Sequence, residues 1–387
     1  MTFQNSIVFT VALSFSCLLT ACGPTRVAIS PRDVTEVVVR PSKGGLEFCP
    51  GEAFQIEVVA HLKNGTYCSS TDRTRGCLKE QDAVIDPAQV QIDGSTGGLE
   101  GNPKKFLWNT TSDPLVTAAT GVAFKAWIQQ ATPAGVERSM LAQTRLTPVY
   151  GCRLQGFFGG GYGGSQGENG GPGPDLDIAV TTLATPFYPS AALIRVIRGT
   201  ERTYYLSPSP DAPIRITSAA QSGGQGAQGV NGRDGAAGQN ASSACARGGD
   251  GEHGHHGSQG GPGGSGGPGG RIRITLDSAA AGQLRGRILA TSQGGDAGVG
   301  GRGGVGGRGG RGGNGGPSSP DCASGGVSGS SGVNGSDGPG GQAGYPGPNG
   351  PMPSVGTASR GALFGTELGL IQQIESTRLQ RSVSKVW

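Results

Sequence analysis

The chain has 387 residues, a formal net charge of +4 and only 15% charged residues. Its charges are dispersed, so no basic block indicates binding to nucleic acid or to an anionic membrane surface. Glycine and proline contribute 76 and 25 residues, a share that would indicate disorder if it had no period. Because glycine recurs at every third position, the composition instead predicts an ordered repeat beside a β-rich region that holds the apolar core.

An apolar stretch from Ile7 to Leu19 lies near the start of the chain. It is shorter than the roughly 20 residues of a membrane-spanning helix and is typical of a signal peptide. It runs into Leu19 to Gly23 (LTACG), which resembles the lipobox of bacterial lipoproteins. One departure from that pattern is the absence of Lys and Arg from residues 1–6. An ordinary cleaved signal with an incidental cysteine is the alternative.

The lipobox resemblance implies that residues 1–21 are removed and that the thiol of Cys22 carries a lipid. The lipid would tether the protein to a membrane, with residues 22–33 as a linker. Gly23, rather than Asp, after the modified cysteine implies the outer membrane or the cell surface. Export also places the remaining cysteines in an oxidising compartment, where disulfides form.

Residues 34–153 are expected to form a β domain. Phe54 to Leu62 alternates apolar and polar residues, which is the pattern of a half-buried strand. Six or seven short strands suit an immunoglobulin-like β-sandwich, a resemblance in pattern only because the Cys-Trp-Cys signature is absent. Trp108 and Trp127 are interpreted as core residues. The other expected strands are 34–40, 90–93, 105–109, 122–128 and 140–149.

Residues 154–350 form the second region, with glycine at every third position in five tracts. A left-handed polyproline II helix has three residues per turn, so each helix gains a side-chain-free edge that a neighbour can approach. Its amides must then pair with neighbouring chains or water. A collagen triple helix is the alternative, but the tracts are short, interrupted and poor in proline. The tracts are 161–173, 223–238, 248–269, 295–316 and 326–350, here called tracts 1 to 5.

The number of glycines per triplet predicts where a tract lies. Tract 4 mostly has two glycines in each triplet and is expected inside the bundle, whereas tract 5 mostly has one and is expected outside. These tracts resemble the polyglycine-II bundles of the Obg N-terminal domain, the springtail antifreeze protein and certain phage tail-fibre adhesins. Gly260 to Asp277, a tract that flows into a strand, is the most Obg-like segment. The resemblance implies a fold and says little about function.

A small β-sheet is expected at the base of the bundle, formed by the strand-like pieces between the tracts. Residues 351–387 are the C-terminal segment. Its apolar residues from Ala358 to Trp387 are spaced roughly as in a helix, which leaves open whether the segment forms a docked short helix or a frayed tail. The strand-like pieces are 193–197, 203–206, 214–217, 272–276 and 284–291.

Six cysteines remain after the signal peptide and the lipid are accounted for, an even number that predicts three disulfides. Tracts 2 and 4 each leave a strand and end in a short loop with one cysteine, so Cys245 and Cys322 should meet at the far tip. Tracts of this length span roughly 50–70 Å, which puts the tip beyond reach of the N-terminal cysteines. The expected pairs are Cys49 with Cys152, Cys68 with Cys77, and Cys245 with Cys322.

Few residues suggest chemistry. His253 and His256 would share a face of a three-fold helix and are weak candidates for a metal site, against the interpretation of a solvated edge. Arg302, Arg308 and Arg311 have the spacing of RNA-binding RGG repeats. An exported protein is separated from cellular RNA, so hydrated arginines are the simpler interpretation. Two G-x-S-x-G matches, 163–167 and 263–267, lack the strand-turn-helix context of a hydrolase.

The function expected from the sequence is that of a non-catalytic, lipid-anchored cell-envelope protein whose glycine-rich module is structural or adhesive. No cofactor is expected. The alternative is a binding protein that recognises a polysaccharide, another cell surface or, less readily, ice. An envelope enzyme is a distant third, since no arrangement of His, Asp, Ser or Cys supports catalysis.

Overall fold

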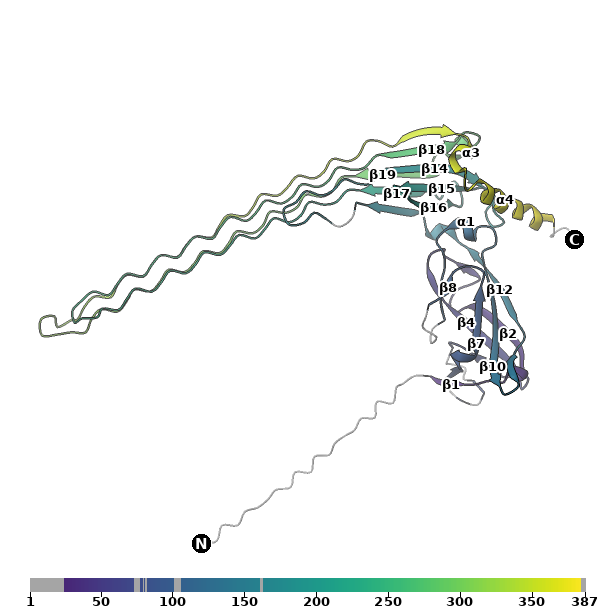
Figure 1. Cartoon of the computed structure of the whole chain (residues 1–387), viewed down its shortest axis with the longest axis horizontal. Coiled ribbons are helices and arrows are strands. Elements are labelled where there is room, and N and C mark those ends of the chain that lie inside the picture. Colours follow the sequence, from purple (N-terminus) through teal and green to yellow (C-terminus); the bar gives the residue numbers. More distant parts are fainter. Residues whose placement is uncertain are drawn as a thin grey trace, which may run out of the picture. The chain divides into compact units, whose positions relative to one another are not determined.

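The computed structural model describes residues 24–72, 77, 78, 80, 82–100, 106–160 and 163–383 (Figure 1). The fold is mainly β, as the sequence predicted. The chain forms two compact units. The first unit consists of the described residues up to Leu46 and of those within Ala53–Asn109 and Val122–Leu146. The second unit consists of Glu47–Glu52, Thr110–Gly121 and the described residues from Thr147 onward.

The first unit contains two larger sheets. One has the order β2-β4-β9-β8, with β5 on β4, and the other centres on β10, which pairs with β7, β11 and β12. A short parallel pair, β1 (Thr25–Val27) and β6 (Ala83–Ile85), completes the unit. The bounds are β2 Val34–Pro41, β4 Ala53–Leu62, β5 Tyr67–Ser69, β7 Val90–Gly94, β8 Gly98–Leu99, β9 Leu107–Asn109, β10 Val122–Thr132, β11 Gly135–Arg138 and β12 Ala142–Pro148.

Aromatic rings join the two sheets of the first unit. Phe124 of β10 meets Trp108 of β9 and Phe54 of β4 edge-on, with ring centroids 4.9 and 6.0 Å apart. Trp108 is 4% exposed, as expected of a core residue. Trp127 is not in the core: it is half-buried, and the guanidinium of Arg138 lies 5.7 Å from its ring centroid. The expectation was wrong for Trp127 because its side of β10 is only partly covered.

The strand β4 also departs from the expected alternation. Ile56 and Val58 are buried as predicted, but Glu57 and Val59, on the opposite side of the strand, are also buried and are 5% and 8% exposed. Their side of the strand is covered near β5, where Ser69 contacts the Glu57 carboxylate. Both sides of β4 are therefore buried at its centre.

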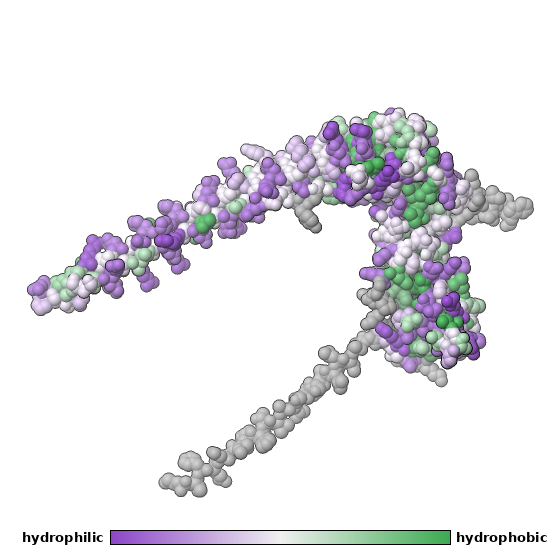
Figure 2. All heavy atoms as spheres, viewed as in Figure 1, coloured by the Kyte–Doolittle hydropathy of each residue, from purple (hydrophilic) through white to green (hydrophobic). Residues whose placement is uncertain are grey.

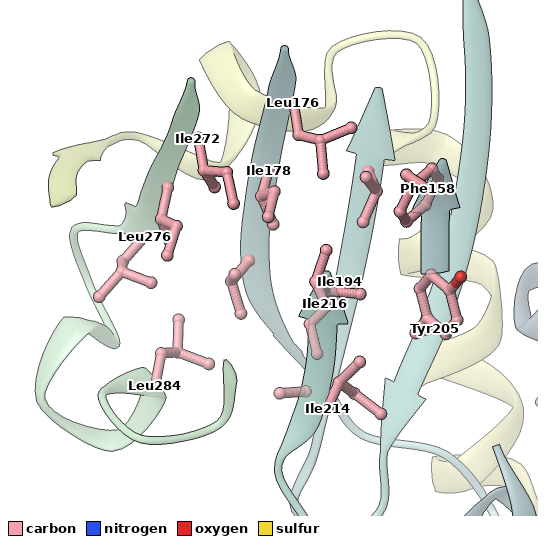
Figure 3. Packing of buried hydrophobic residues seen from close by; sticks show 14 residues of the cluster. Phe158, Leu176, Ile178, Ile194, Tyr205, Ile214, Ile216, Ile272, Leu276 and Leu284 are labelled. Atoms are coloured by element: carbon pink, nitrogen blue, oxygen red, sulfur yellow. The ribbon is translucent and has the colours of Figure 1, made fainter. Parts of the chain in front are cut away.

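The second unit is built on two packed sheets, where the sequence suggested one small sheet. Strands β13, β17 and β19 are all parallel, and the other sheet has the order β16-β15-β14-β18-β20. Their facing sides meet in one hydrophobic cluster that includes Ile178, Ile194, Ile216 and Ile272 (Figure 3). The bounds are β13 Gln155–Gly159, β14 Leu176–Leu183, β15 Ala191–Arg198, β16 Glu201–Ser207, β17 Ile214–Ala219, β18 Ile272–Asp277, β19 Ile288–Gln293 and β20 Ser354–Ala358.

Four strands of this unit differ from the expectation, since β13, β14 and β20 were not among the predicted strands and β19 is shorter than predicted. The sequence predicted a strand over 284–291, but β19 begins at Ile288 because Ala281–Leu284 forms a helical turn, α2, that buries Leu284 in the cluster. The central strand β14 was missed, because its apolar run Ile178-Ala179-Val180 does not alternate with polar residues. Nearly its whole length is buried, because hydrophobic clusters cover both faces of this strand.

The C-terminal segment is a docked helix rather than a frayed tail over its described part. Helices α3 (Arg360–Phe364) and α4 (Leu368–Val383) follow β20, and α1 (Pro114–Thr117) lies beside them. Phe364, Ile371 and Ile374 are at most 1% exposed, in a cluster with Leu183 and Leu193 of the five-stranded sheet. These helices therefore cover the side of that sheet opposite the other cluster.

The glycine tracts connect the two sheets of the second unit. Tract 2 leaves β17 and tract 3 returns to β18; tract 4 leaves β19 and tract 5 returns to β20, so the tracts run side by side (Figure 1). Their surface is mainly hydrophilic (Figure 2). Among the described residues, no helix is long and apolar enough to cross a membrane.

Candidate functional site

The residue expected to carry the lipid, Cys22, lies outside the described residues. Lipidation therefore stays a prediction. The features that can be placed are the disulfides, the packed tracts with their side chains, and two clusters of polar side chains.

Three disulfides join the pairs that the sequence predicted. Cys68 and Cys77 close a short loop in the first unit, with Cα atoms 4.6 Å apart. Within the second unit, Cys49 is bonded to Cys152 and Cys245 to Cys322, with Cα separations of 6.1 and 5.9 Å. The last bond links the loop after tract 2 to the loop after tract 4, so both outgoing tracts end at one tip.

Backbone hydrogen bonds tie tract 4 to three other tracts. Its Gly304 donates to the carbonyl of Ser258 in tract 3, and its Arg302 carbonyl accepts from Gly229 of tract 2, at 2.9 and 2.7 Å. Its Gly304 carbonyl accepts from Gly338 of tract 5 at 2.8 Å. The same pattern repeats at every third residue along the tracts. Tract 3 likewise contacts tracts 2, 4 and 5. The interior position expected for tract 4 is thus shared with tract 3.

Each repeat glycine sits against a neighbour's backbone. A Cβ on Gly310 of tract 4 would overlap the carbonyl oxygen of Ala236, and one on Gly309 would overlap that of Gly332. A Cβ on Gly332 itself, in the outer tract 5, would overlap the carbonyl oxygen of Glu252. Tract 5 therefore has fewer glycines packed against a neighbouring backbone than tract 4 has, but each of these glycines is equally enclosed.

Side chains of tracts 2 and 5 accept hydrogen bonds from backbone N–H groups that take no part in the backbone hydrogen bonds between tracts. Asn231 and Asp234 of tract 2 accept the N–H groups of Val305 and Arg308 at 2.9 and 2.7 Å. Asn334 of tract 5 accepts that of Gly309 at 2.9 Å. We call such side-chain-to-amide bonds rungs. Sequence reasoning missed them, although the recurrence of Asn and Asp as the last residue of a triplet is a visible signal.

His253 and His256 of tract 3 also form rungs. Their Nδ1 atoms accept the backbone N–H groups of Val333 and Ser336 of tract 5, each at 2.9 Å. A nitrogen that accepts this bond has no lone pair left for a metal, and in the neutral ring the other nitrogen then carries the proton. In the described part of the chain, no group of three or more His, Cys, Asp and Glu side chains could hold a metal ion. The geometry thus favours a structural role for both histidines.

Arg302, Arg308 and Arg311 lie along one edge of tract 4, because each is the non-glycine residue of its triplet. All three are exposed, and none forms an ion pair with a described residue. Two exposed valines stand in the same row, Val299 at 60% and Val305 at 58%. The row therefore presents three cationic and two apolar side chains to solvent.

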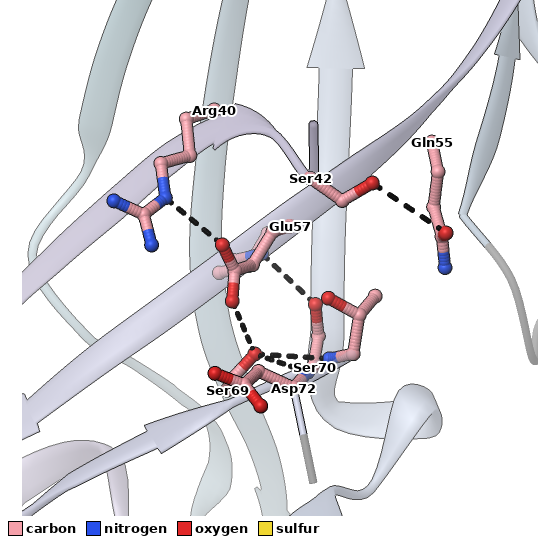
Figure 4. Close-up of polar contacts among 9 residues, drawn as sticks. Arg40, Ser42, Gln55, Glu57, Ser69, Ser70 and Asp72 are labelled. Carbon is pink, nitrogen blue, oxygen red and sulfur yellow. Dashed lines mark hydrogen bonds and ion pairs between the residues drawn. The ribbon is translucent and has the colours of Figure 1, made fainter. Parts of the chain in front are cut away.

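A polar cluster of the first unit surrounds a buried carboxylate (Figure 4). Glu57 Oε1 accepts from Ser69 Oγ at 2.7 Å, and its Oε2 accepts from Arg40 Nε at 2.9 Å. Ser69 Oγ in turn accepts the N–H groups of Thr71 and Asp72 at 3.0 and 2.8 Å. A hydroxyl oxygen has two acceptor positions, and both are taken, so Ser69 has no lone pair free for nucleophilic attack.

A shallow cavity of about 210 Å³ adjoins this cluster, with Arg40, His61 and Tyr67 in its lining. The ring centroids of His61 and Tyr67 are 6.0 Å apart. The cavity is smaller than the roughly 300–1,000 Å³ typical of small-molecule sites. The cluster is best explained as the anchor of the loop that follows Ser69.

A second polar cluster fixes the C-terminal helices. Glu367, 8% exposed, accepts from Arg195 Nη1 at 3.0 Å, Arg202 Nη1 at 2.8 Å and the Tyr204 hydroxyl at 2.9 Å. Burial favours the neutral acid, but the hydrogen bond from Tyr204 and the charge of Arg195 outweigh it and lower the pKa of Glu367. Burial and the bond to Glu367 raise the pKa of Tyr204 to about 12. These groups are all engaged with one another, as expected of a structural cluster.

No family model, curated protein or solved structure matches the chain.

Proposed function

We propose that this chain is an exported, lipid-anchored protein of the bacterial cell envelope with a non-catalytic, structural or adhesive role. An immunoglobulin-like β-sandwich would make up the first unit, and a polyglycine-II bundle on a β base the second. The lipid on Cys22 would attach the protein to the outer membrane or the cell surface.

One observation carries the proposal: the glycine tracts are hydrogen-bonded to one another at every third residue. Gly229, Gly232 and Gly235 of tract 2 donate in turn to Arg302, Val305 and Arg308 of tract 4 at 2.7 to 2.8 Å. That period matches the three residues per turn of a polyproline II-type helix. At about 3.1 Å per residue, tract 4 (295–316) spans roughly 70 Å. A cross-linked bundle of this length is suited to holding the surface at its tip away from the β-sheets at its base.

Epitope labelling on intact cells tests this proposal. A short epitope inserted after Ser318, in the loop that carries Cys322, should be labelled on unpermeabilised bacteria that produce the lipid-anchored protein. The control carries the same epitope after Gly44, in a loop of the first unit. Labelling of the tip epitope only after permeabilisation would contradict a surface role for the bundle.

The exposed row on tract 4 favours a second candidate function, the recognition of a polysaccharide. Arg302, Arg308 and Arg311 project from one edge without ion-pair partners among the described residues, and guanidinium groups form planar, forked hydrogen bonds to carboxylate groups. A glycan array of the purified protein tests it. The triple Arg→Gln variant should lose binding, whereas Arg233→Gln, exposed on tract 2 outside the row, should retain it. Equal binding by both variants would exclude the row as the binding surface.

A further inference from the structure

Four rungs between tracts 3 and 5 share one arrangement, and two of them use a histidine as the acceptor. In each rung, a tract 3 side chain accepts a tract 5 amide that lies 80 positions later. The acceptors are Asp250, His253, His256 and Ser265, opposite Ser330, Val333, Ser336 and Tyr345. Histidine is the side chain that changes charge between about pH 5 and 8.

The two histidines accept through Nδ1, and this requires a neutral ring. An imidazolium carries a proton on both nitrogens and accepts no hydrogen bond. Protonation would therefore set an N–H of His253 against the N–H of Val333, which lies 2.9 Å from Nδ1. At His256 it would oppose the N–H of Ser336 in the same way. The Ser336 hydroxyl, 2.8 Å from the same Nδ1, could turn to accept, but the backbone amide cannot.

We propose that His253 and His256 form a pH-sensitive joint between tracts 3 and 5, which is closed when both rings are neutral and opens when they are protonated. This goes beyond the proposed function because it assigns a conformational response to the bundle. The joint occupies two successive triplets in the part of tract 3 nearer the tip, and both side chains are exposed, so protons reach them directly.

The charged groups around the joint do not replace the lost bonds. On tract 3 itself the neighbours are Asp250, which accepts from Arg247, and Glu252, which accepts from Ala236, together with His255. Tract 5 contributes Asp337, whose Oδ1 accepts from Gly306. Tract 2 brings Arg233 and Asp234, and tract 4 brings Arg308 and Arg311, to the same level of the bundle. Among the described residues, none of these forms an ion pair with either histidine.

The backbone ladder between the two tracts survives protonation. Gly251, Gly254 and Gly257 donate to Ser330, Val333 and Ser336 at 2.9 to 3.0 Å, and these bonds contain no titratable group. Acid should therefore loosen the two tracts locally rather than separate them. Since the unfolded chain binds the same protons without this loss, the stability of the bundle falls as the pH falls through the histidine range.

The chain itself suggests the matched variants. Asparagine forms the equivalent rung at Asn231 and Asn334, so the double variant His253→Asn and His256→Asn keeps an acceptor that does not titrate. His255 has no side-chain hydrogen bond among the described residues, so His255→Asn is the control for removing a titrating ring from tract 3.

Thermal unfolding of the full mature protein between pH 8 and 5 tests the joint. The parent and His255→Asn should lose about 2–4 °C more in Tm per rung on acidification than the double variant. The amide resonances of Val333 and Ser336 should also titrate in the parent, while that of Ser330, held by Asp250, should not change in this range. The proposal is contradicted if the double variant retains the parent's pH dependence, or if the resonances of those two amides do not change with pH.

Discussion

Cys245 and Cys322 are bonded to each other, with Cα atoms 5.9 Å apart, although their separation in the sequence is 77. Around this bond the backbones of the two loops also meet, since Cys245 donates its N–H to the Pro317 carbonyl at 3.0 Å. The tip is therefore closed both covalently and by hydrogen bonds.

Removing this bond should destabilise the second unit more than removing a short-loop disulfide destabilises the first. In the chain-entropy model, a double Cys245→Ser and Cys322→Ser variant loses about 4.5 kcal/mol, and Cys68→Ser with Cys77→Ser loses about 2.5 kcal/mol. Urea unfolding, followed separately for the two units, measures both losses. Peptide mapping of the unreduced protein that links Cys245 or Cys322 to any other cysteine would contradict the closed tip.

Two neighbouring glycines of tract 5 should differ strongly in how much stability the same substitution costs. A Cβ on Gly341 would overlap the carbonyl oxygen of Gly261, whereas the nearest atom to a Cβ on Gly340 is 3.7 Å away. Gly341→Val should therefore cost at least about 1–3 kcal/mol through overpacking, and Gly340→Val should stay within about 0.5 kcal/mol of the parent. Thermal unfolding compares them, and equal losses would indicate a loose tract.

Gly310→Val in tract 4 and Gly332→Val in tract 5 should be about equally harmful. Counting glycines per triplet suggests that the inner tract is the more sensitive one, but both Cβ atoms would overlap a neighbouring carbonyl oxygen. The two losses of unfolding free energy should agree within about 0.5 kcal/mol. A markedly smaller loss for Gly332→Val would show that tract 5 moves aside.

Glu367→Gln should weaken the docking of the C-terminal helices in a pH-dependent way. Because the folded pKa of Glu367 is lowered, its contribution is present above the unfolded pKa and is lost as the pH falls through the folded value. The parent should be more stable than the variant at pH 7, and this difference should shrink by pH 3. Urea unfolding at the two pH values gives the answer, and a constant difference would rule out the charged form as its source.

Cys22→Ser should abolish acylation and release the protein from the membrane fraction, since the thiol is the proposed attachment point. Labelling with radioactive palmitate, followed by cell fractionation, measures both effects. Cys17→Ser, within the proposed signal peptide, is the control and should change neither. Palmitate still incorporated into the Cys22 variant would disprove the assignment.

Much of the second unit follows from local sequence. A glycine at every third position indicates which edge a neighbour can approach, and the strands before tracts 2 and 4 indicate that both run in the same direction. Those two observations are sufficient to place Cys245 and Cys322 at one tip. They are sufficient because a repeat with a fixed rise converts positions along the chain into positions in space.

The remaining features were decided by contacts between segments far apart in the chain. The residues next to Glu57 in the sequence do not predict its burial, which depends on contacts with Ser69 and Arg40 from other strands. The role of His253 likewise depends on an amide 80 residues away. Periodicity in a sequence reports how each segment repeats, and so it determined the tracts, their direction and the tip disulfide. Only the tertiary structure decided which side chains meet between segments, because a polar group is stabilised by whichever partner the packing brings within hydrogen-bonding distance.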